Sequence, residues 1–181
     1  MRKIERIAED YLVILAQQGN RAALGKLADL RGPRLLAHAT RLLCNREEAR
    51  DAVQDAWVEI LRGLPSLTEP RAFAAWAMRI VTRRCARDIR GKQRQRQLAA
   101  EYSADVETTT EPKGGKAADA QSVRNAIAAL PPEQAATIAL FYLEDMSVAE
   151  VSVALDVPQG TVKTRLMHAR AKLYNTFERS D

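Results

Sequence analysis

The chain has 181 residues, of which 46% are hydrophobic and only 5% aromatic, and it carries a formal net charge of +5. This length allows one domain or two small ones, and so few aromatic residues suit small helical cores built from Ala, Leu, Val and Ile. The positive charge indicates a polyanionic partner, and because no apolar run could cross a bilayer, we expect a soluble cytoplasmic protein with no membrane partner.

Residues 4–94 predict helices throughout, because apolar residues recur at spacings of three and four between short breaks. The breaks fall at Gly19-Asn20, at Gly32-Pro33 and over residues 64–70. The expected helices cover residues 4–18, 21–31, 33–44, 46–63 and 71–95. Strand patterns have little support, so the sequence favours an all-α fold.

The predicted helix over residues 46–63 carries an acidic ridge, which consists of Glu47, Asp51, Asp55 and Glu59 at successive i, i+4 positions. Each like-charged pair disfavours an isolated helix by roughly 0.2–0.5 kcal/mol. The face expected to pack on the domain consists of Ala49, Val53, Ala56, Trp57, Ile60 and Leu61. The ridge is either a docking surface for a basic protein partner or a solvated acidic face.

The next predicted helix is strongly basic, with eight Lys and Arg residues against the single acid Asp88 over residues 79–96. Phe73, Trp76 and Met78 stand just upstream. Cations that follow a backbone, next to rings able to stack on unpaired bases, are typical of single-stranded nucleic-acid binding. A tryptophan in a helical domain also has an ordinary explanation as a core residue.

The helical pattern ends in residues 97–119, where polar residues dominate and five acidic residues outnumber two lysines. We expect this stretch to be an acidic flexible linker between two small helical domains.

Catalytic and metal-binding patterns are not found in the sequence. Cys44 and Cys85 are isolated from each other and from His38 and His168, so buried free thiols are expected. A nuclease would need a metal-binding carboxylate cluster or a nucleophile with a base, and we find neither. We therefore expect no catalytic residue, no metal and no cofactor.

Residues 130–173 predict three short helices that end in a basic one. Ser147 and Glu150 fit a capping box that starts the second helix. The chain then breaks over residues 156–160, and the third helix is expected to begin near Thr161. Two short helices joined by so tight a turn predict a helix-turn-helix.

The last predicted helix separates a buried face from an exposed one. Its inward residues are expected to be Val162, Leu166, Ala169 and Leu173. Its candidates for contact with base edges are Lys163, Thr164, Met167 and His168. Arg165, Arg170 and Lys172 lie on the flanks, where they would reach phosphates. The alternative is an ordinary solvated basic helix.

These motifs together resemble bacterial sigma factors of the extracytoplasmic-function (ECF) class, in the sigma-70 family. Region two of that family is similar to EEARDAVQDAWVEILRGL and RAFAAWAMRIVTRRCARDIRGKQR in this chain, and region four to LPPEQ, YLEDMSVAEVSVAL, VPQGTVKTRL and ARAKL. The resemblance implies region two over residues 1–96, the linker over 97–119 and region four over 120–181. It also implies that the linker occupies space in the polymerase otherwise used by RNA.

The resemblance implies three sets of site residues. Those for core RNA polymerase, made of the beta and beta-prime subunits among others, are Glu47, Asp51, Gln54, Asp55 and Glu59. Those for the melted nontemplate strand of the −10 element are Ser66, Leu67, Arg71, Trp76, Arg79, Arg83, Arg84 and Arg87. Those for the duplex −35 element are Thr161, Lys163, Thr164, Arg165, Met167, His168 and Arg170. An anti-sigma factor is a further implied partner.

This chain departs from the resembled family at three positions. Arg83 stands where asparagine is common, Asp156 where the helix-turn-helix often has glycine, and His168 where arginine is frequent. Promoter sequence is therefore the property that the resemblance transfers least.

A different class of protein, a self-sufficient helix-turn-helix regulator, would use the same C-terminal helices. Such a regulator should dimerise and recognise a palindrome without polymerase. The sequence shows neither a heptad seam nor an obvious ligand-binding domain to support it.

Overall fold

The computed structural model describes residues 2–102 and 119–178, which are helical and contain no strand, so the all-α prediction is confirmed. The N-terminal domain comprises α1 (Arg2–Gln17), α2 (Arg21–Leu43), α3 (Arg46–Gly63), two 3₁₀ turns, η1 (Leu64–Ser66) and η2 (Pro70–Ala72), and α4 (Phe73–Tyr102). The C-terminal domain comprises α5 (Asp119–Ala128), α6 (Pro132–Tyr142), α7 (Val148–Leu155) and α8 (Gln159–Glu178). None of the described helices is both long and apolar enough to cross a membrane.

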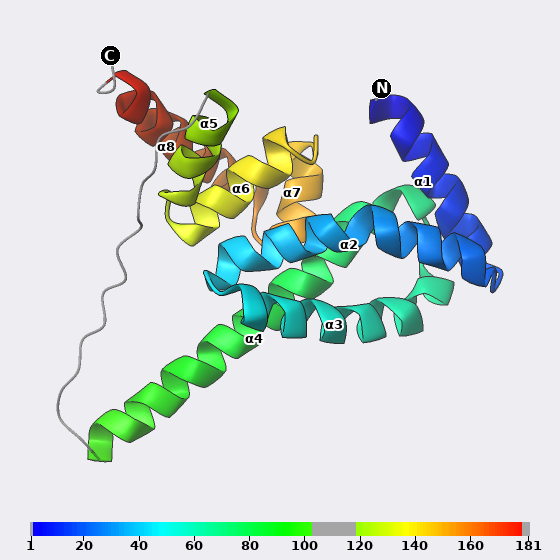
Figure 1. Ribbon diagram of the computed structural model, residues 1–181, viewed down its shortest axis with the longest axis horizontal. Helices are drawn as coiled ribbons and strands as arrows, with labels where there is room; N and C mark the ends of the chain where they lie inside the picture. The colour runs from blue at the N-terminus through cyan, green and yellow to red at the C-terminus, as the bar shows by residue number, and fades with distance from the viewer. Residues whose placement is uncertain (1, 103–118, 179–181) are drawn as a thin grey trace.

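In the N-terminal domain, α2, α3 and α4 pack on one another and α1 crosses α2 (Figure 1). The expected break at Gly32-Pro33 is wrong, because α2 runs without interruption from Arg21 to Leu43. A proline inside a helix removes one backbone hydrogen bond. Here Pro33 faces solvent, while Leu27, Arg31 and Leu35 form a buried stripe on the other side that holds the helix together.

The two cysteines differ in environment. Cys85 is buried on α4, and burial raises the pKa of its thiol to about 12. Cys44 ends α2 in the left-handed region at φ 54° and is exposed, so the expectation of a buried thiol is wrong for this residue. Its position at a helix C-cap, outside the packed face, explains the exposure.

Helix α4 extends beyond the expected end at residue 95 and includes residues 97–102, which belong to the expected linker. Gln, Leu, Ala and Glu make up most of this stretch, and all four favour helix in their own right. The far end of α4 projects from the rest of the molecule (Figure 1). The rest of the expected linker, residues 103–118, lies outside the described residues.

The C-terminal domain contains the expected helix-turn-helix. Ser147 and Glu150 form the capping box at the start of α7, and Asp156 ends this helix in the left-handed region at φ 56°. Helix α8 begins at Gln159 instead of Thr161, because the Val162 amide donates to the Pro158 carbonyl and closes the first turn there. Val162, Leu166 and Ala169 are buried and Leu173 is partly buried, as predicted.

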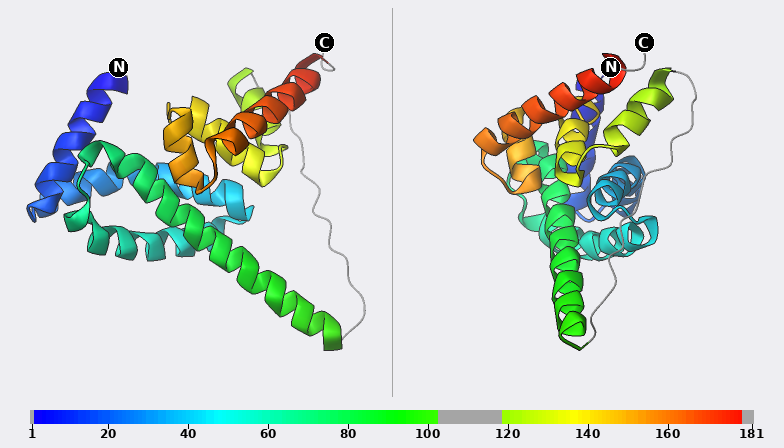
Figure 2. Two further views of the ribbon diagram at one scale, coloured as in Figure 1. Left: turned by 180° about the vertical axis from the view of Figure 1, so that it is seen from behind. Right: turned by 90° about the vertical axis from the view of Figure 1, so that its left-hand side faces the viewer.

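The two domains lie in direct contact. Helix α7 packs against α4, and α6 packs against α2. Figure 2 shows α7 beside the first half of α4. No pattern in the sequence predicts this contact.

Candidate nucleic-acid interface

The acidic residues of α3 form an accessible surface. Asn45 caps the helix by accepting hydrogen bonds from the Glu47 and Glu48 amides, and burial of Ala49, Val53, Ala56 and Ile60 turns the ridge outward. The five candidate residues for polymerase binding, Glu47, Asp51, Gln54, Asp55 and Glu59, are all exposed. Glu47 forms an ion pair with Arg50, and Asp55 forms one with Arg84 of α4.

Two apolar residues accompany this acidic surface. Val58 is 45% exposed and Leu61 is 44% exposed. The expectation that Leu61 packs inward is wrong, because Ile60 takes the buried position at this end of the helix. Val58 lies four residues after Gln54, and Leu61 lies three residues after Val58. This helical spacing could have predicted an apolar strip beside the acidic residues. A surface with acidic and apolar parts suits a protein partner better than a nucleic acid.

Side chains of α1 hold the loop before α4. The Gln17 amide donates to the carbonyl oxygens of Leu64 and Leu67, at 3.0 and 2.7 Å. Ser66 is exposed, and Leu67 is half-buried against the core. Arg71 is exposed and lies 3.8 Å from a carboxylate oxygen of Asp10. The loop therefore presents Ser66 and Arg71 to solvent on a rigid base.

Trp76 is half-buried and packs against the core. Its ring lies 6.1 Å from the Phe73 ring, measured between centroids, and its edge covers Gly63. A Cβ atom on Gly63 would lie 2.8 Å from Trp76 Cζ2. This tight contact fixes the indole while leaving part of it accessible to a ligand.

The four candidate arginines of α4 have different partners. Arg84 pairs with Asp55 within the N-terminal domain, and Arg87 is exposed. Arg79 and Arg83 both pair with Asp156 of the C-terminal domain, at 2.7 and 3.2 Å. Hydrogen bonds from Arg83 and from Arg79 lower the pKa of Asp156, so the acid is charged at neutral pH.

The exposed face of α8 is accessible. Lys163, Thr164, Met167 and His168 are exposed as predicted, with Met167 at 58%, while Thr161 is half-buried. Arg165 pairs with Glu133 of α6. Arg170 donates to the Tyr142 hydroxyl at 2.9 Å, and its guanidinium lies 5.8 and 5.6 Å from the Phe141 and Tyr142 ring centroids. The two arginines are thus held in place beside the exposed face.

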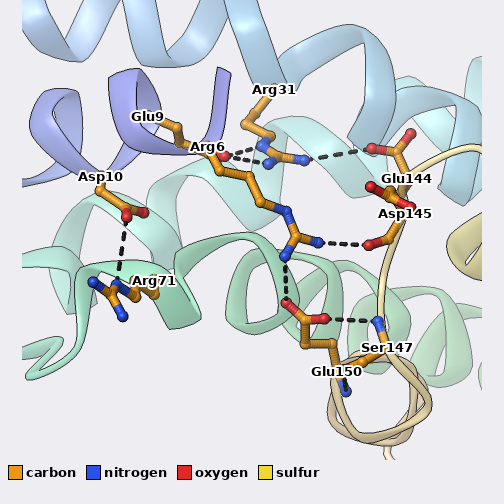
Figure 3. Close-up of polar contacts among 9 residues, drawn as sticks. All are labelled: Arg6, Glu9, Asp10, Arg31, Arg71, Glu144, Asp145, Ser147 and Glu150. Atoms are coloured by element: carbon orange, nitrogen blue, oxygen red, sulfur yellow. Dashed lines mark hydrogen bonds and ion pairs between the residues drawn. The ribbon is translucent and has the colours of Figure 1, made fainter. Parts of the chain in front are cut away.

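A charged cluster joins the domains at a second place (Figure 3). Arg31 pairs with Glu9 of its own domain and, at 3.4 Å, with Glu144 of the loop between α6 and α7. Arg34 also reaches Glu144, at 3.1 Å. Arg6 donates to the Asp145 carbonyl at 2.6 Å and lies 3.6 Å from Glu150. Sequence reasoning missed this cluster, although Arg31 on an otherwise apolar stripe of α2 was a signal.

Within residues 2–102 and 119–178, whose side chains the structure largely describes, no group of three or more His, Cys, Asp or Glu side chains could hold a metal ion. The arrangement offers charged and apolar surfaces for binding, at both ends of the molecule.

Two families of known proteins match this chain. The family described as Sigma-70 region 2 matches residues 27–95, and Sigma-70, region 4 matches residues 120–173. Together these matches include all of α3, α6 and α7 and most of α2, α4, α5 and α8.

Several curated proteins are similar to this chain. The ECF RNA polymerase sigma factor SigW of Bacillus subtilis is 27% identical over 168 residues, with 87% of this chain and 90% of that protein covered. The ECF RNA polymerase sigma-E factor of Escherichia coli is 25% identical, with 96% of each chain covered. SigM of Mycobacterium tuberculosis is 33% identical over 130 residues, which are 70% of this chain and 63% of that protein.

Two solved structures share the fold. The sigma factor RpoE of Bartonella quintana, in complex with the anti-sigma factor NepR, matches with a TM-score of 0.66 and 22% identity, over 86% of this chain and 96% of that one. CnrH, in complex with the cytosolic domain of CnrY, matches with a TM-score of 0.64 and 24% identity, over 96% and 99%.

Proposed function

The chain belongs to the sigma-70 family and is an ECF-type RNA polymerase sigma factor, and from this premise we propose how it directs core polymerase to promoters and promotes their melting. The joint match to region two and region four, in that order, carries this conclusion. A self-sufficient helix-turn-helix regulator would account for the C-terminal match alone. We assign region two to residues 1–96, a linker to 97–119 and region four to 120–181.

The acidic surface of α3 is the proposed contact with core polymerase, through its beta and beta-prime subunits. Glu47, Asp51, Gln54, Asp55 and Glu59 would meet a basic partner surface, and Val58 and Leu61 would add apolar contact. Charge complementarity of this kind speeds association and fixes orientation.

The η1–η2 loop and the first half of α4 form the proposed surface for the melted −10 strand. Its members are Ser66, Leu67, Arg71, Trp76, Arg79, Arg83, Arg84 and Arg87. The arginines would follow the phosphates, and the accessible part of Trp76 would contact an unpaired base. Contacts made only with separated strands offset the free energy of opening base pairs.

Helix α8 is the proposed reader of the −35 duplex in the major groove. Lys163, Thr164, Met167 and His168 would reach base edges, while Thr161, Arg165 and Arg170 would contact phosphates at the sides.

The protein performs no covalent chemistry in this proposal, needs no metal or cofactor, and works in the cytoplasm where polymerase and DNA are. An anti-sigma factor is a proposed inhibitory partner. The structures of RpoE with NepR and of CnrH with a domain of CnrY support that proposal, because both pair a protein of this fold with another chain.

Transcription in vitro with purified core polymerase tests the function. We expect new start sites on genomic fragments only when the protein is added, and a mobility shift of promoter DNA that requires core polymerase. A specific shift of palindromic DNA by the protein alone, with no new start sites, would contradict the proposal and favour the self-sufficient regulator.

A further inference from the structure

The C-terminal domain covers part of the surface that we assign to the melted strand. Helix α7 packs against α4, and the turn after α7 brings Asp156 to Arg79 and Arg83. Each carboxylate oxygen of Asp156 accepts a hydrogen bond from one arginine: Oδ1 accepts from Arg79, and Oδ2 accepts from Arg83. A carboxylate held between two guanidinium groups occupies the place that a phosphate would take.

A partly buried polar contact crosses the same junction. The Thr82 hydroxyl of α4 lies 2.8 Å from the Ala154 carbonyl, to which it can donate, and 2.8 Å from His38 Nε2. Ala154 is in the last turn of α7, where carbonyl groups have no partner within the helix. Docking on α4 therefore satisfies a carbonyl that would otherwise need water.

The second contact between the domains is the charged cluster drawn in Figure 3. Glu144 is only 12% exposed at its side chain and faces both Arg31 and Arg34. Arg31 is 7% exposed and keeps Glu9 as a second partner. The junction thus has acids of the C-terminal domain paired with arginines of the N-terminal domain at two separate places.

We propose that the free protein closes on itself, with Asp156 and Glu144 as the acids that keep region four on region two and hide the strand-binding arginines. The inference rests on the proposed −10 role of Arg79 and Arg83, because closure competes with DNA only if those residues bind it.

Distance measurements on the full chain test closure directly. Cys44 is exposed and Cys85 is buried, so one dye on Cys44 and one on an introduced Asn175→Cys on α8 report the separation of the domains. The free protein should show one dominant high-transfer population. The double variant Glu144→Gln, Asp156→Asn should shift the ratio of open to closed molecules about tenfold or more, because one of its acids is nearly buried.

The single variant Asp156→Asn repeats the test in a protein that is expected to stay folded, since asparagine tolerates the left-handed conformation at this position. It should shift the ratio by about two- to fivefold, as expected for an exposed pair. Asp29→Asn removes an exposed acid of α2 and should change neither the distance nor the binding. Unchanged distances in both Asp156→Asn and the double variant Glu144→Gln, Asp156→Asn, or an open wild-type protein, would overturn the inference.

Binding of a single-stranded oligonucleotide to the free protein gives the second readout. Asp156→Asn and the double variant Glu144→Gln, Asp156→Asn should bind the oligonucleotide more tightly than the wild type, by the factor that follows from the measured change in the ratio of open to closed molecules. Asp29→Asn should bind like the wild type. An open variant without tighter binding would overturn the competition between closure and DNA. Transcription with core polymerase separates the two ideas, because the function fails only if the wild type starts no transcript.

Discussion

Gly63 shows how one missing side chain shapes the strand-binding surface. It ends α3 in an ordinary right-handed conformation, so its value lies in the space that it leaves for Trp76. That Trp76 lies partly in the core could be predicted from its residue type. Its contact with Gly63 could not, because residues 63 and 76 meet only after the two 3₁₀ turns between them have formed.

Gly63→Ala should lower the free energy of unfolding by about 1–3 kcal/mol, since the added methyl group overlaps the indole. Urea denaturation measures this loss. Gly25→Ala is the matched control, because a Cβ there meets nothing within 4 Å, and it should stabilise α2 by up to about 1 kcal/mol. Equal behaviour of the two variants would contradict the role of the contact.

His38 should make stability depend on pH. Burial lowers its pKa to about 3, and the nearby Arg41 acts in the same direction. The folded protein holds the neutral ring, while the unfolded chain takes up a proton below about pH 6.5. This stability is fully present above pH 6.5 and is lost as the pH falls toward 3.

Chemical denaturation at pH 7 and pH 5 checks this expectation. The difference attributable to His38 should be about 2 kcal/mol. His38→Gln should remove it, and His168→Gln on exposed α8 should keep it. The same loss in wild type and His38→Gln would show that other groups cause the pH dependence.

At the scale of single helices, the charge pattern of α3 opposes stability and favours binding. Asp51 has acidic neighbours four residues away on both sides, Glu47 and Asp55. Asp51→Lys should therefore raise the free energy of unfolding by about 0.5–1 kcal/mol, while it weakens binding to core polymerase about tenfold.

Thermal unfolding and a binding titration with core polymerase measure these opposite effects. Asp29→Lys makes the same charge change at an exposed site of α2 and should leave the affinity within about twofold. If Asp51→Lys binds like the wild type, the acidic surface of α3 is not the polymerase contact.

Helix existence and helix faces could be predicted from the sequence because both depend on neighbours within a few residues. The inward residues of α8 and the capping box at Ser147 follow from spacing alone. The continuity of α2 through Pro33 could not, because burial of Leu27 and Leu35 against other helices outweighs the local cost of the proline.

At the scale of the whole molecule, the contact between domains was beyond sequence reasoning. Arg31 and Glu144 are separated by 113 residues, and no periodicity links them. Local patterns showed which residues are charged, but not that charges on two domains neutralise one another. The described structure therefore adds a closed arrangement to a pair of domains that could be recognised separately.

Salt should open that arrangement. The screening length falls from about 10 Å at 0.1 M to about 3 Å at 1 M, which weakens the exposed pairs of Asp156. Small-angle scattering should show a larger radius of gyration at 1 M salt. The double variant Glu144→Gln, Asp156→Asn should be expanded at both concentrations, and a wild-type radius that is constant or shrinks would contradict the electrostatic account.

The projecting end of α4 has a thermodynamic consequence. Residues 89–97 are exposed on every side, so no tertiary burial protects their backbone amides. A short solvated helix frays on its own, and its amide protons should exchange with deuterium quickly in the free protein. Slower exchange on polymerase or DNA would mean that the partner completes this helix, and that part of the association enthalpy comes from ordering it.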